Sequence, residues 1–287
     1  MEKLKRFVRK NPAFTVFFLL ALCVIGAAVF APALVTHDPY EAVLADAVQP
    51  PGPEHWFGTD RMGRDLFSRV IYGARTSLSA SLALVCIIMT AGTILGILAG
   101  WFGGILDAVI MRISDMMISF PGMVLALAVA GILGASMKNA VLAIAVVSWT
   151  KYARLARSLV LKIRERDYIA AARVTGSRTS HILWSYLLPN VLPTILITGA
   201  TDIGSMMMEI AALSFLGFGA QAPTAEWGLM LNEGRAYMTA APWLMVFPGL
   251  AIFITVVVFN LLGDSLRDVL DPREERQEPG LGRKENE

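Results

Sequence analysis

The sequence predicts an all-α integral membrane protein with six transmembrane helices. Of its 287 residues, 55% are hydrophobic and 17% are charged, and the mean hydropathy is +0.58. A soluble globular domain is about 45–50% apolar and about 25% charged. This composition excludes an ordinary soluble enzyme and a disordered chain. The only two cysteines, Cys23 and Cys86, lie inside apolar runs, so a disulfide-built secreted domain is also excluded.

Six stretches are apolar and long enough to cross a bilayer, which takes roughly 20 residues. Those without any acidic or basic residue are 11–36, 76–106, 116–137 and 236–263. The stretch 140–161 contains Lys151, Arg154 and Arg157, whose long side chains can snorkel to an interface. The stretch 191–216 is interrupted by Asp202 and Glu209. Each stretch is predicted to form one membrane-spanning helix.

The placement of basic residues predicts the orientation, because lysine and arginine are enriched on the cytoplasmic side. With six spans, the two termini and the even-numbered loops hold 19 of the 25 basic residues, and the other loops hold 6. Both termini are therefore predicted to be cytoplasmic. Eight of these 19 residues fall between Lys151 and Arg178, in the fourth connecting loop.

The first span has features of a cleaved signal peptide, with a basic start and the tripeptide Ala31-Pro32-Ala33. Its uncharged run is longer than the core of a signal peptide, about 7–15 residues, and a proline lies in the would-be cleavage site. We therefore favour a retained helix.

Three regions are predicted. Residues 1–75 form the first transmembrane helix and an extracytoplasmic loop, 76–272 form the core transmembrane domain, and 273–287 form a charged, disordered cytoplasmic tail. Near the end of the outer loop, residues 63–73 carry apolar side chains at helical spacing, which predicts a short amphipathic helix on the outer membrane surface. Gly92, Gly96 and Gly100 are four residues apart and permit close helix packing, within the chain or against a partner subunit.

The fourth loop, about 162–189, is predicted to form a helix, a glycine turn and a second helix. Ala170, Ala171 and Ala172 are strong helix formers with small side chains. Gly176 can adopt a turn conformation that most residues avoid, and Pro189 marks the entry to the fifth span. Such a small, alanine-faced helix can dock into a groove of another protein, although a plain amphipathic interface helix has the same pattern.

The residues of this loop resemble the EAA loop of bacterial ABC import permeases. The family pattern is Glu-Ala-Ala, three residues, Gly, nine residues, Ile-x-Leu-Pro. Here Ala171, Ala172, Gly176, Leu188 and Pro189 match it, while alanine at 170 and tyrosine at 186 depart from it. In the family this loop is the coupling helix that sits in a cleft of the ATP-binding subunit. The resemblance therefore implies ATPase-coupling roles for these residues, with Asp167 or Glu165 in place of the missing glutamate.

A second motif, residues 57–78, resembles the signature of C-type subunits of dipeptide, oligopeptide and nickel permeases. Further matches cover most of the chain from 12 to 273, among them 119–121, 213–217, 226–228 and 263–272. Residues 202–207 and 222–228 look closest to the nickel branch. The resemblance thus implies the type I ABC importer permease fold and transport of nickel, as an ion or a chelate, with peptides as the alternative substrates.

The same resemblance implies the partners: a second homologous permease subunit, two ATP-binding subunits and an extracytoplasmic substrate-binding protein in the bacterial inner membrane. The chain itself has no phosphate-binding loop, so we expect it to bind no cofactor, with ATP and magnesium held by the ATPase subunits. We expect it to contact membrane lipid but no nucleic acid, and to be a permease rather than an enzyme.

Acids inside membrane spans are expensive and are functional candidates. Asp202, Met206 and Glu209 share one helix face and are predicted to line the translocation path. In the alternative, Asp202 lies near the cytoplasmic interface, Glu209 pairs with a neighbouring helix and Met206 only fills space. No histidine falls in a predicted span, so no metal site is assigned, and His37 and His55 are interpreted as loop residues without a ligand role.

Two other function classes fit parts of the sequence. A channel or gradient-driven secondary transporter would explain Asp202 and Glu209 but not the long basic fourth loop. A membrane-embedded enzyme would need paired catalytic residues at a shared depth, and the sequence offers none.

Overall fold

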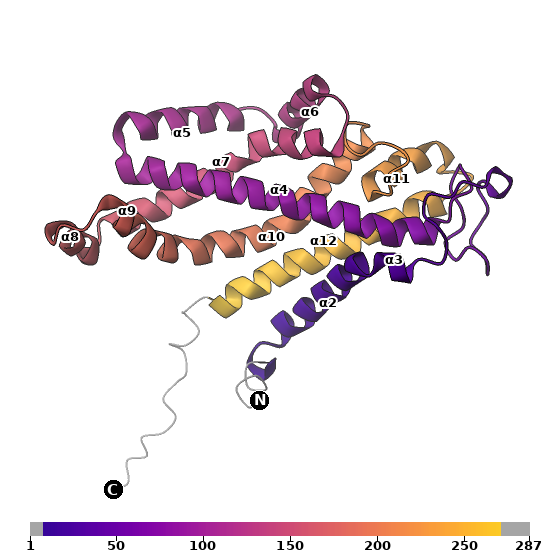
Figure 1. The fold of residues 1–287 in the computed structure, drawn as a ribbon, viewed down its shortest axis with the longest axis horizontal. Coiled ribbons are helices and arrows are strands. Elements are labelled where there is room, and N and C mark those ends of the chain that lie inside the picture. Colours follow the sequence, from indigo (N-terminus) through magenta and orange to yellow (C-terminus); the bar gives the residue numbers. More distant parts are fainter. Residues whose placement is uncertain (1–7, 271–287) are drawn as a thin grey trace, which may run out of the picture.

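A computed structural model describes residues 8–270, and this part of the chain is built of helices joined by loops, with one isolated bridge between Thr59 and Asp65 and no longer strand (Figure 1). The expected tail at 273–287 lies outside the described residues. The helices are α2 (Pro12–Val29), α3 (Ala31–Leu34), η1 (Leu44–Asp46), α4 (Leu66–Phe102), α5 (Gly104–Ile118), α6 (Gly122–Leu133), α7 (Met137–Arg164), α8 (Asp167–Val174), α9 (Thr179–Ile182), η2 (Leu183–Leu187), α10 (Leu188–Phe215), α11 (Trp227–Gly234), η3 (Arg235–Tyr237) and α12 (Trp243–Leu270).

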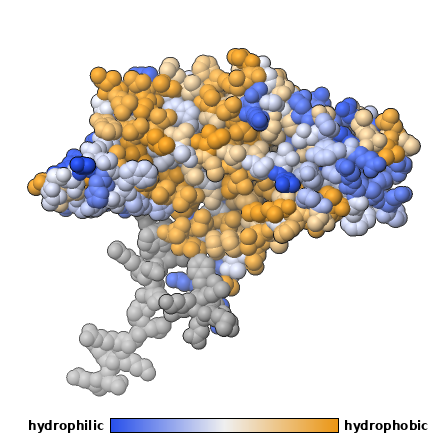
Figure 2. Space-filling view, in the orientation of Figure 1, coloured by the Kyte–Doolittle hydropathy of each residue, from blue (hydrophilic) through white to orange (hydrophobic). Residues whose placement is uncertain are grey.

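The described helices are compatible with six membrane spans. By length and composition, α2, α4, α12 and the continuous stretch Thr179–Phe215 can cross a membrane, and the bent pair α5–α6 adds a fifth if it forms one broken span. The sixth is α7, whose 28 residues reach about 42 Å at 1.5 Å per residue but include several basic side chains. Figure 2 shows apolar side chains over the middle of the visible face and hydrophilic ones gathered at its two ends. The predicted all-α membrane fold with six spans is confirmed.

The third predicted span is not a single helix. α5 ends at Ile118, α6 begins at Gly122, and their axes differ by 94°. Pro121 precedes α6, and a residue before proline is pushed out of the helical region, so the chain turns there. Residues 116–137 therefore contain the end of one helix and the whole of a shorter one.

The predicted surface helix at 63–73 is also wrong. The helical pattern belongs to the first two turns of α4, which runs unbroken for 37 residues. Asp65 caps this helix by accepting a hydrogen bond from the Ser68 backbone N–H at 2.7 Å. Leu66 and Val70 are buried against neighbouring helices and not laid on a membrane surface.

The predicted glycine stripe packs α4 against α7, within the chain. A Cβ at Gly96 would lie 2.7 Å from the Ala156 Cβ, and one at Gly100 would lie 2.9 Å from the Val160 Cβ. A Cβ at Gly92 would lie 2.6 Å from the Tyr152 Cβ. Real carbon atoms do not approach so closely, so only glycine permits this helix spacing.

A second group of helices surrounds α12, which packs against α10 and α2. A Cβ at Gly263 of α12 would lie 2.7 Å from the Thr201 Cα of α10. α11 docks on α4 through the Trp227 indole, which donates a hydrogen bond to the Val70 carbonyl at 2.8 Å. Glu226 caps α11 by accepting from the Gly228 and Leu229 backbone N–H groups, and burial raises the pKa of its carboxyl.

Charged residues join the outer loop, the start of α4 and α11, at the end of the molecule opposite α8 (Figure 1). Arg64 binds Asp60 at 2.6 Å and Glu233 at 3.0 Å, and the fully buried Arg69 faces the same two acids at 3.4 and 3.6 Å. Arg69 also donates to the carbonyl oxygens of Pro39, Pro223 and Thr224. Segments about 150 residues apart in sequence are thereby held together.

We expect Arg69→Ala to lower the free energy of unfolding by about 3–5 kcal/mol, because it removes a charge from a buried ion-pair network. The matched control is Arg61→Ala, because Arg61 reaches the same Glu233 at 3.4 Å but its side chain is 47% exposed. That change should cost about 0–1 kcal/mol. Denaturation of the purified variants in detergent measures both, and equal losses would contradict a special role for the buried arginine.

Candidate functional site

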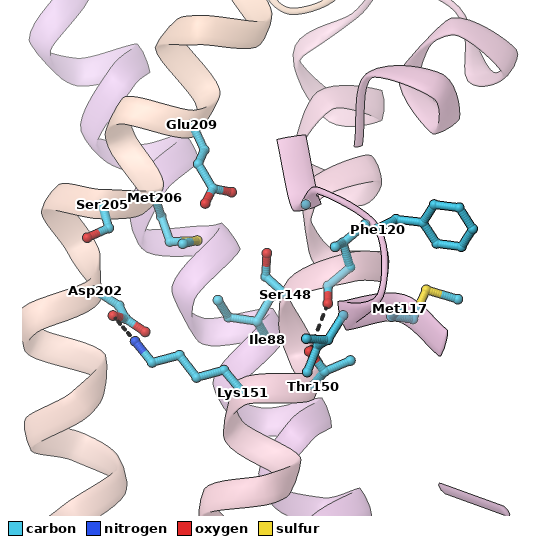
Figure 3. Close-up of a pocket in the computed structure, with 13 residues that line it drawn as sticks. Ile88, Met117, Phe120, Ser148, Thr150, Lys151, Asp202, Ser205, Met206 and Glu209 are labelled. Atoms are coloured by element: carbon cyan, nitrogen blue, oxygen red, sulfur yellow. Dashed lines mark hydrogen bonds and ion pairs between the residues drawn. The ribbon is translucent and has the colours of Figure 1, made fainter. Parts of the chain in front are cut away.

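A cavity of about 390 Å³ opens between α10 and α7, beside the break between α5 and α6. Figure 3 shows the side chains that line it, with α10 on one side and α7 and the bend on the other. The lining residues are Ile88, Met117, Ile118, Phe120, Gly122, Val147, Ser148, Thr150, Lys151, Asp202, Ser205, Met206 and Glu209.

The three residues predicted for a translocation path all line this cavity. Asp202, Met206 and Glu209 recur at steps of four and three residues, which places them on one face of α10. Asp202 and Met206 are buried, and Glu209 is half-buried. The helical periodicity thus brings two acids and a thioether to one wall.

Asp202 is held from α7. Its Oδ1 accepts from the Lys151 ammonium at 2.6 Å (Figure 3). Its Oδ2 accepts from the Tyr152 hydroxyl at 2.8 Å. These contacts bridge residues about 50 positions apart in sequence, and no partner was predicted for Lys151. Two features of the sequence could have indicated this pair: Lys151 lies inside one predicted span, and Asp202 lies without an explained role inside another.

Glu209 differs from Asp202. Its side chain extends from α10 into the cavity near the Met206 thioether (Figure 3). Within residues 8–270 its carboxylate has no hydrogen bond or ion pair. The alternative in which Glu209 pairs with a neighbouring helix is therefore not what the structure shows. Lys151 balances Asp202, so an ionised Glu209 leaves a net negative charge in the cavity.

The other two basic residues of the fourth span meet acids on α5. Arg157 binds Asp107 through two hydrogen bonds of 2.5 and 2.6 Å, and Arg154 binds Asp115 at 2.5 Å. These arginines were expected to snorkel to an interface from a bare helix, and instead they tie α5 to α7. Because α5 ends in the bend beside the cavity, the pairs also fix that cavity wall.

The predicted helix, glycine turn and second helix of the fourth loop are α8, Gly176 and α9. Gly176 has a φ of +79°, which favours glycine. Its N–H donates to the Arg173 carbonyl at 3.0 Å, and the Ser177 N–H donates to the Ala172 carbonyl at 3.0 Å. These two bonds form a Schellman motif that ends α8.

α8 has one buried and one exposed face. Ile169 and Ala172 are buried toward the rest of the chain, whereas Asp167, Ala170 and Ala171 are exposed. Tyr168 and Val174 add exposed apolar surface beside them. Leu188 and Pro189, the remaining predicted coupling residues, form the first turn of α10, where Pro189 needs no hydrogen-bond donor. Ala170 and Ala171 have small side chains, so another protein can approach the α8 backbone closely at these two positions.

Two arginines connect the α8 region to the end of α4. The Arg173 guanidinium lies over the Trp101 ring at 4.6 Å, and Arg164 donates to the Gly100 carbonyl at 3.1 Å. Such cation–π and charge-assisted contacts are directional. Through these contacts, Arg173 of α8 and Arg164 of α7 both meet the last turn of α4.

No histidine is among the residues that line the cavity in the described part of the chain. His181 lies in α9, where its Nδ1 is 3.2 Å from the Ser185 hydroxyl. His37 and His55 lie at the opposite end of the molecule, in the loop that precedes α4.

Comparison with known proteins places these features in context. Residues 92–276 match the family described as "Binding-protein-dependent transport system inner membrane component". The chain is 42% identical over 266 residues to the dipeptide transport system permease protein DppC of Alkalihalophilus pseudofirmus, covering 93% of this chain and 88% of that protein. It is 41% identical over 260 residues to the nickel transport system permease protein NikC of Escherichia coli K12, covering 91% and 92%.

A solved structure shares the fold. The inward-facing MetNI methionine ABC transporter contains a chain that superposes with a TM-score of 0.58 at 18% sequence identity. The match covers 72% of this chain and 98% of that one.

Proposed function

Because this chain belongs to the family of inner membrane components of binding-protein-dependent transport systems, we propose that its cavity forms part of the path that carries a cationic substrate into the cell. The family confirms the expected multi-pass membrane location and the expectation of a permease subunit in place of an enzyme. The cavity's role and the identity of the substrate are the proposal.

The observation that carries this proposal is Glu209. An ionisable side chain inside a membrane span that lacks a partner is costly, and such groups typically lie on substrate or ion pathways. Glu209 faces a cavity that already holds the Lys151–Asp202 pair, so a positively charged substrate gains the most there. Met206 lies between the two acids on the same face and adds a soft sulfur atom.

Nickel is the first candidate substrate. It is supported by the resemblance of residues 202–207 and 222–228 to nickel permeases and by the overall similarity to one nickel permease. Nickel sites usually contain imidazole nitrogen atoms, and the described lining has none. We therefore expect nickel to cross as a chelate, or with further ligands from a second permease subunit.

A dipeptide is the second candidate, and the absence of imidazole from the lining favours it. The terminal ammonium of a peptide can pair with Glu209, and the peptide groups can hydrogen-bond Ser148 and Ser205, which also line the cavity. The similarity to a dipeptide permease supports this candidate at the same level of identity.

Energy for transport would come from two ATP-binding subunits that dock on the exposed face of α8 and hold ATP and magnesium. Their closure would displace α8, and the contacts of Arg173 and Arg164 would pass this motion to α4 and α7. A gradient-driven transporter or channel has no need for such a docking helix. We also expect a second homologous permease subunit and an extracytoplasmic binding protein.

We expect Gly176→Val to uncouple transport. A β-branched residue at φ +79° is strained by about 1–3 kcal/mol, which would distort the end of α8. The assembled transporter, reconstituted in proteoliposomes, should lose most substrate-stimulated ATP hydrolysis and uptake. Ala171→Trp, which adds bulk to the exposed face without backbone strain, should do the same by blocking docking.

The matched control for Gly176 is Gly134→Val, because Gly134 has a φ of +87° and equally open surroundings but lies between α6 and α7. It should carry the same strain and retain coupling. Normal subunit assembly and normal uptake in both the Gly176 and Ala171 variants would contradict the proposed role of α8 in coupling.

Glu209→Gln should reduce uptake at least about tenfold, because hydrogen bonds to a charged group contribute about 1.5–3 kcal/mol. Subunit assembly and basal ATP hydrolysis should persist. Glu54→Gln, on the exposed outer loop, is the control that keeps uptake unchanged. Uptake by the Glu209 variant at the wild-type rate would remove the main support for the cavity as a cation path.

The substrate itself is decided by competition. In the same proteoliposomes, supplied with the binding protein, labelled nickel chelate and labelled dipeptide are each challenged with an excess of the other. Uptake of the nickel chelate that dipeptides do not inhibit supports nickel. If the dipeptide is taken up and the nickel chelate is not, the substrate is a dipeptide and the nickel proposal is wrong.

A further inference from the structure

Three potential metal ligands converge on the outer side, at the beginning of α4. Asp65 is the capping residue of α4, and His55 and His37 come from the irregular loop before it. The His55 Nδ1 lies 2.9 Å from the Asp65 Oδ1, and the His37 Nδ1 lies 3.8 Å from the same oxygen. The two imidazole rings are 4.9 Å apart between centroids.

We propose that His37, His55 and Asp65 bind one divalent transition-metal ion on the outer face of this protein. One ligand atom from each residue lies within 4.8 Å of the others. With metal–ligand bonds of about 2.0–2.2 Å, neighbouring ligand atoms lie roughly 2.9–3.6 Å apart. The His55–Asp65 distance of 2.9 Å already meets this range, and His37, whose Nδ1 is 3.8 Å from the same oxygen, has to move closer on metal binding.

A simple hydrogen bond between His55 and Asp65 does not explain the whole arrangement. The His37 Nδ1 lies 3.8 Å from the same carboxylate oxygen, too far to share that hydrogen bond, and 3.1 Å from the Thr36 hydroxyl. Two imidazoles that converge on one oxygen are the donor set of a metal site with two nitrogens and one oxygen.

The three ligands are held by a surrounding shell of hydrogen bonds. The Asp65 Oδ2 accepts from the Ser68 N–H at 2.7 Å, which leaves Oδ1 for the ion. The His37 backbone N–H donates to the Ser68 hydroxyl at 3.1 Å, so the same serine orients both residues. Hydrogen-bonding groups of this kind orient the residues that bind a metal and raise the affinity for it.

Burial is graded across the cluster in the way that an open metal site needs. The side chains of Asp65, His55 and His37 are 1%, 13% and 41% exposed. Beyond His37 lies a cavity of about 430 Å³ that is also lined by Asp38, Tyr40 and Tyr72. This space admits water, or part of a chelating molecule, as the remaining ligands.

The donor set selects the class of ion. Imidazole suits zinc, nickel, copper and cobalt, whereas magnesium and calcium prefer shells made wholly of oxygen. The bound ion would join the outer loop to the first turn of α4, next to the Arg64–Asp60 pair. It lies at the other end of the molecule from α8 and apart from the cavity at Asp202, so the proposal is independent of the transport proposal (Figure 1).

The test uses the full-length chain, purified without a polyhistidine tag and placed in lipid nanodiscs. Titration with Co²⁺, followed by its visible absorption, and calorimetry with Zn²⁺ and Ni²⁺ should show one bound ion per chain. His37→Asn and His55→Asn should each weaken binding at least about tenfold, since even the loss of an outer-shell partner costs about that much. An excess of Mg²⁺ should not displace the ion.

The chain contains a matched control, because its third histidine is remote. His181→Asn should leave both the affinity and the Co²⁺ spectrum unchanged. Thermal unfolding without metal separates loss of a ligand from loss of folding. Because the His37 side chain is 41% exposed, His37→Asn should bind metal more weakly while its unfolding midpoint without metal stays unchanged.

The proposal is overturned if no ion binds at one per chain, if His37→Asn and His55→Asn bind as tightly as the unchanged chain, or if Mg²⁺ displaces the ion. Glu209→Gln should bind the metal with unchanged affinity. Failure of the metal-site proposal would therefore not contradict the proposed translocation path, and failure of the translocation path would not contradict the metal site.

Discussion

The contact between α4 and α7 is the constraint on which the rest of the structure depends. Three glycines at four-residue spacing let the two backbones approach more closely than any larger residue permits. This contact sets the position of α7, and α7 carries Lys151, Arg154 and Arg157 toward their acids on two other helices. Without the close approach, three basic side chains would lie in the membrane without partners, at considerable cost.

Charge neutralisation inside the bundle follows from that placement. Lys151, Arg154 and Arg157 of α7 each pair with one acid, on α5 or α10. Partly exposed ion pairs add little net stability, but these three define one register between helices, since a shift of one turn would separate the charges. Glu209 is the acid in the cavity wall that this scheme leaves unmatched, and for that reason it is the best candidate for contact with substrate.

Local patterns in the sequence predicted much of this fold. The long apolar stretches predicted the membrane spans. The alanine run and Gly176 predicted α8 and the turn that follows it. The helical spacing of Asp202, Met206 and Glu209 predicted that they share one face of a helix. The break at Pro121 was readable in principle, because proline restricts the residue before it. It was missed because the apolar stretch continues across it.

What could not be predicted depends on contacts between distant segments. The partner of Lys151 lies 51 residues away, and the salt bridge between Arg64 and Glu233 joins residues 169 positions apart. The three proposed metal ligands come from a loop in which His37 and Asp65 are 28 positions apart. No periodicity specifies such a loop, so its two histidines were interpreted as residues without a shared site.

A chain of contacts links the exposed helix α8 to the cavity. α8 holds the end of α4 through Arg173, α4 is fixed to α7 by the glycine contact, and α7 reaches α10 through Lys151 and Asp202. α4 and α7 are packed too closely to slide without clashes, so a force on α8 would move them as one body. The Lys151–Asp202 pair would then be the joint between that body and α10. If the pair lengthens in one state of the transport cycle, Asp202 becomes free beside Glu209, and the cavity gains negative charge in that state alone. Differential binding of this kind is what a transport cycle needs, because a substrate shifts an equilibrium only by binding its two states unequally.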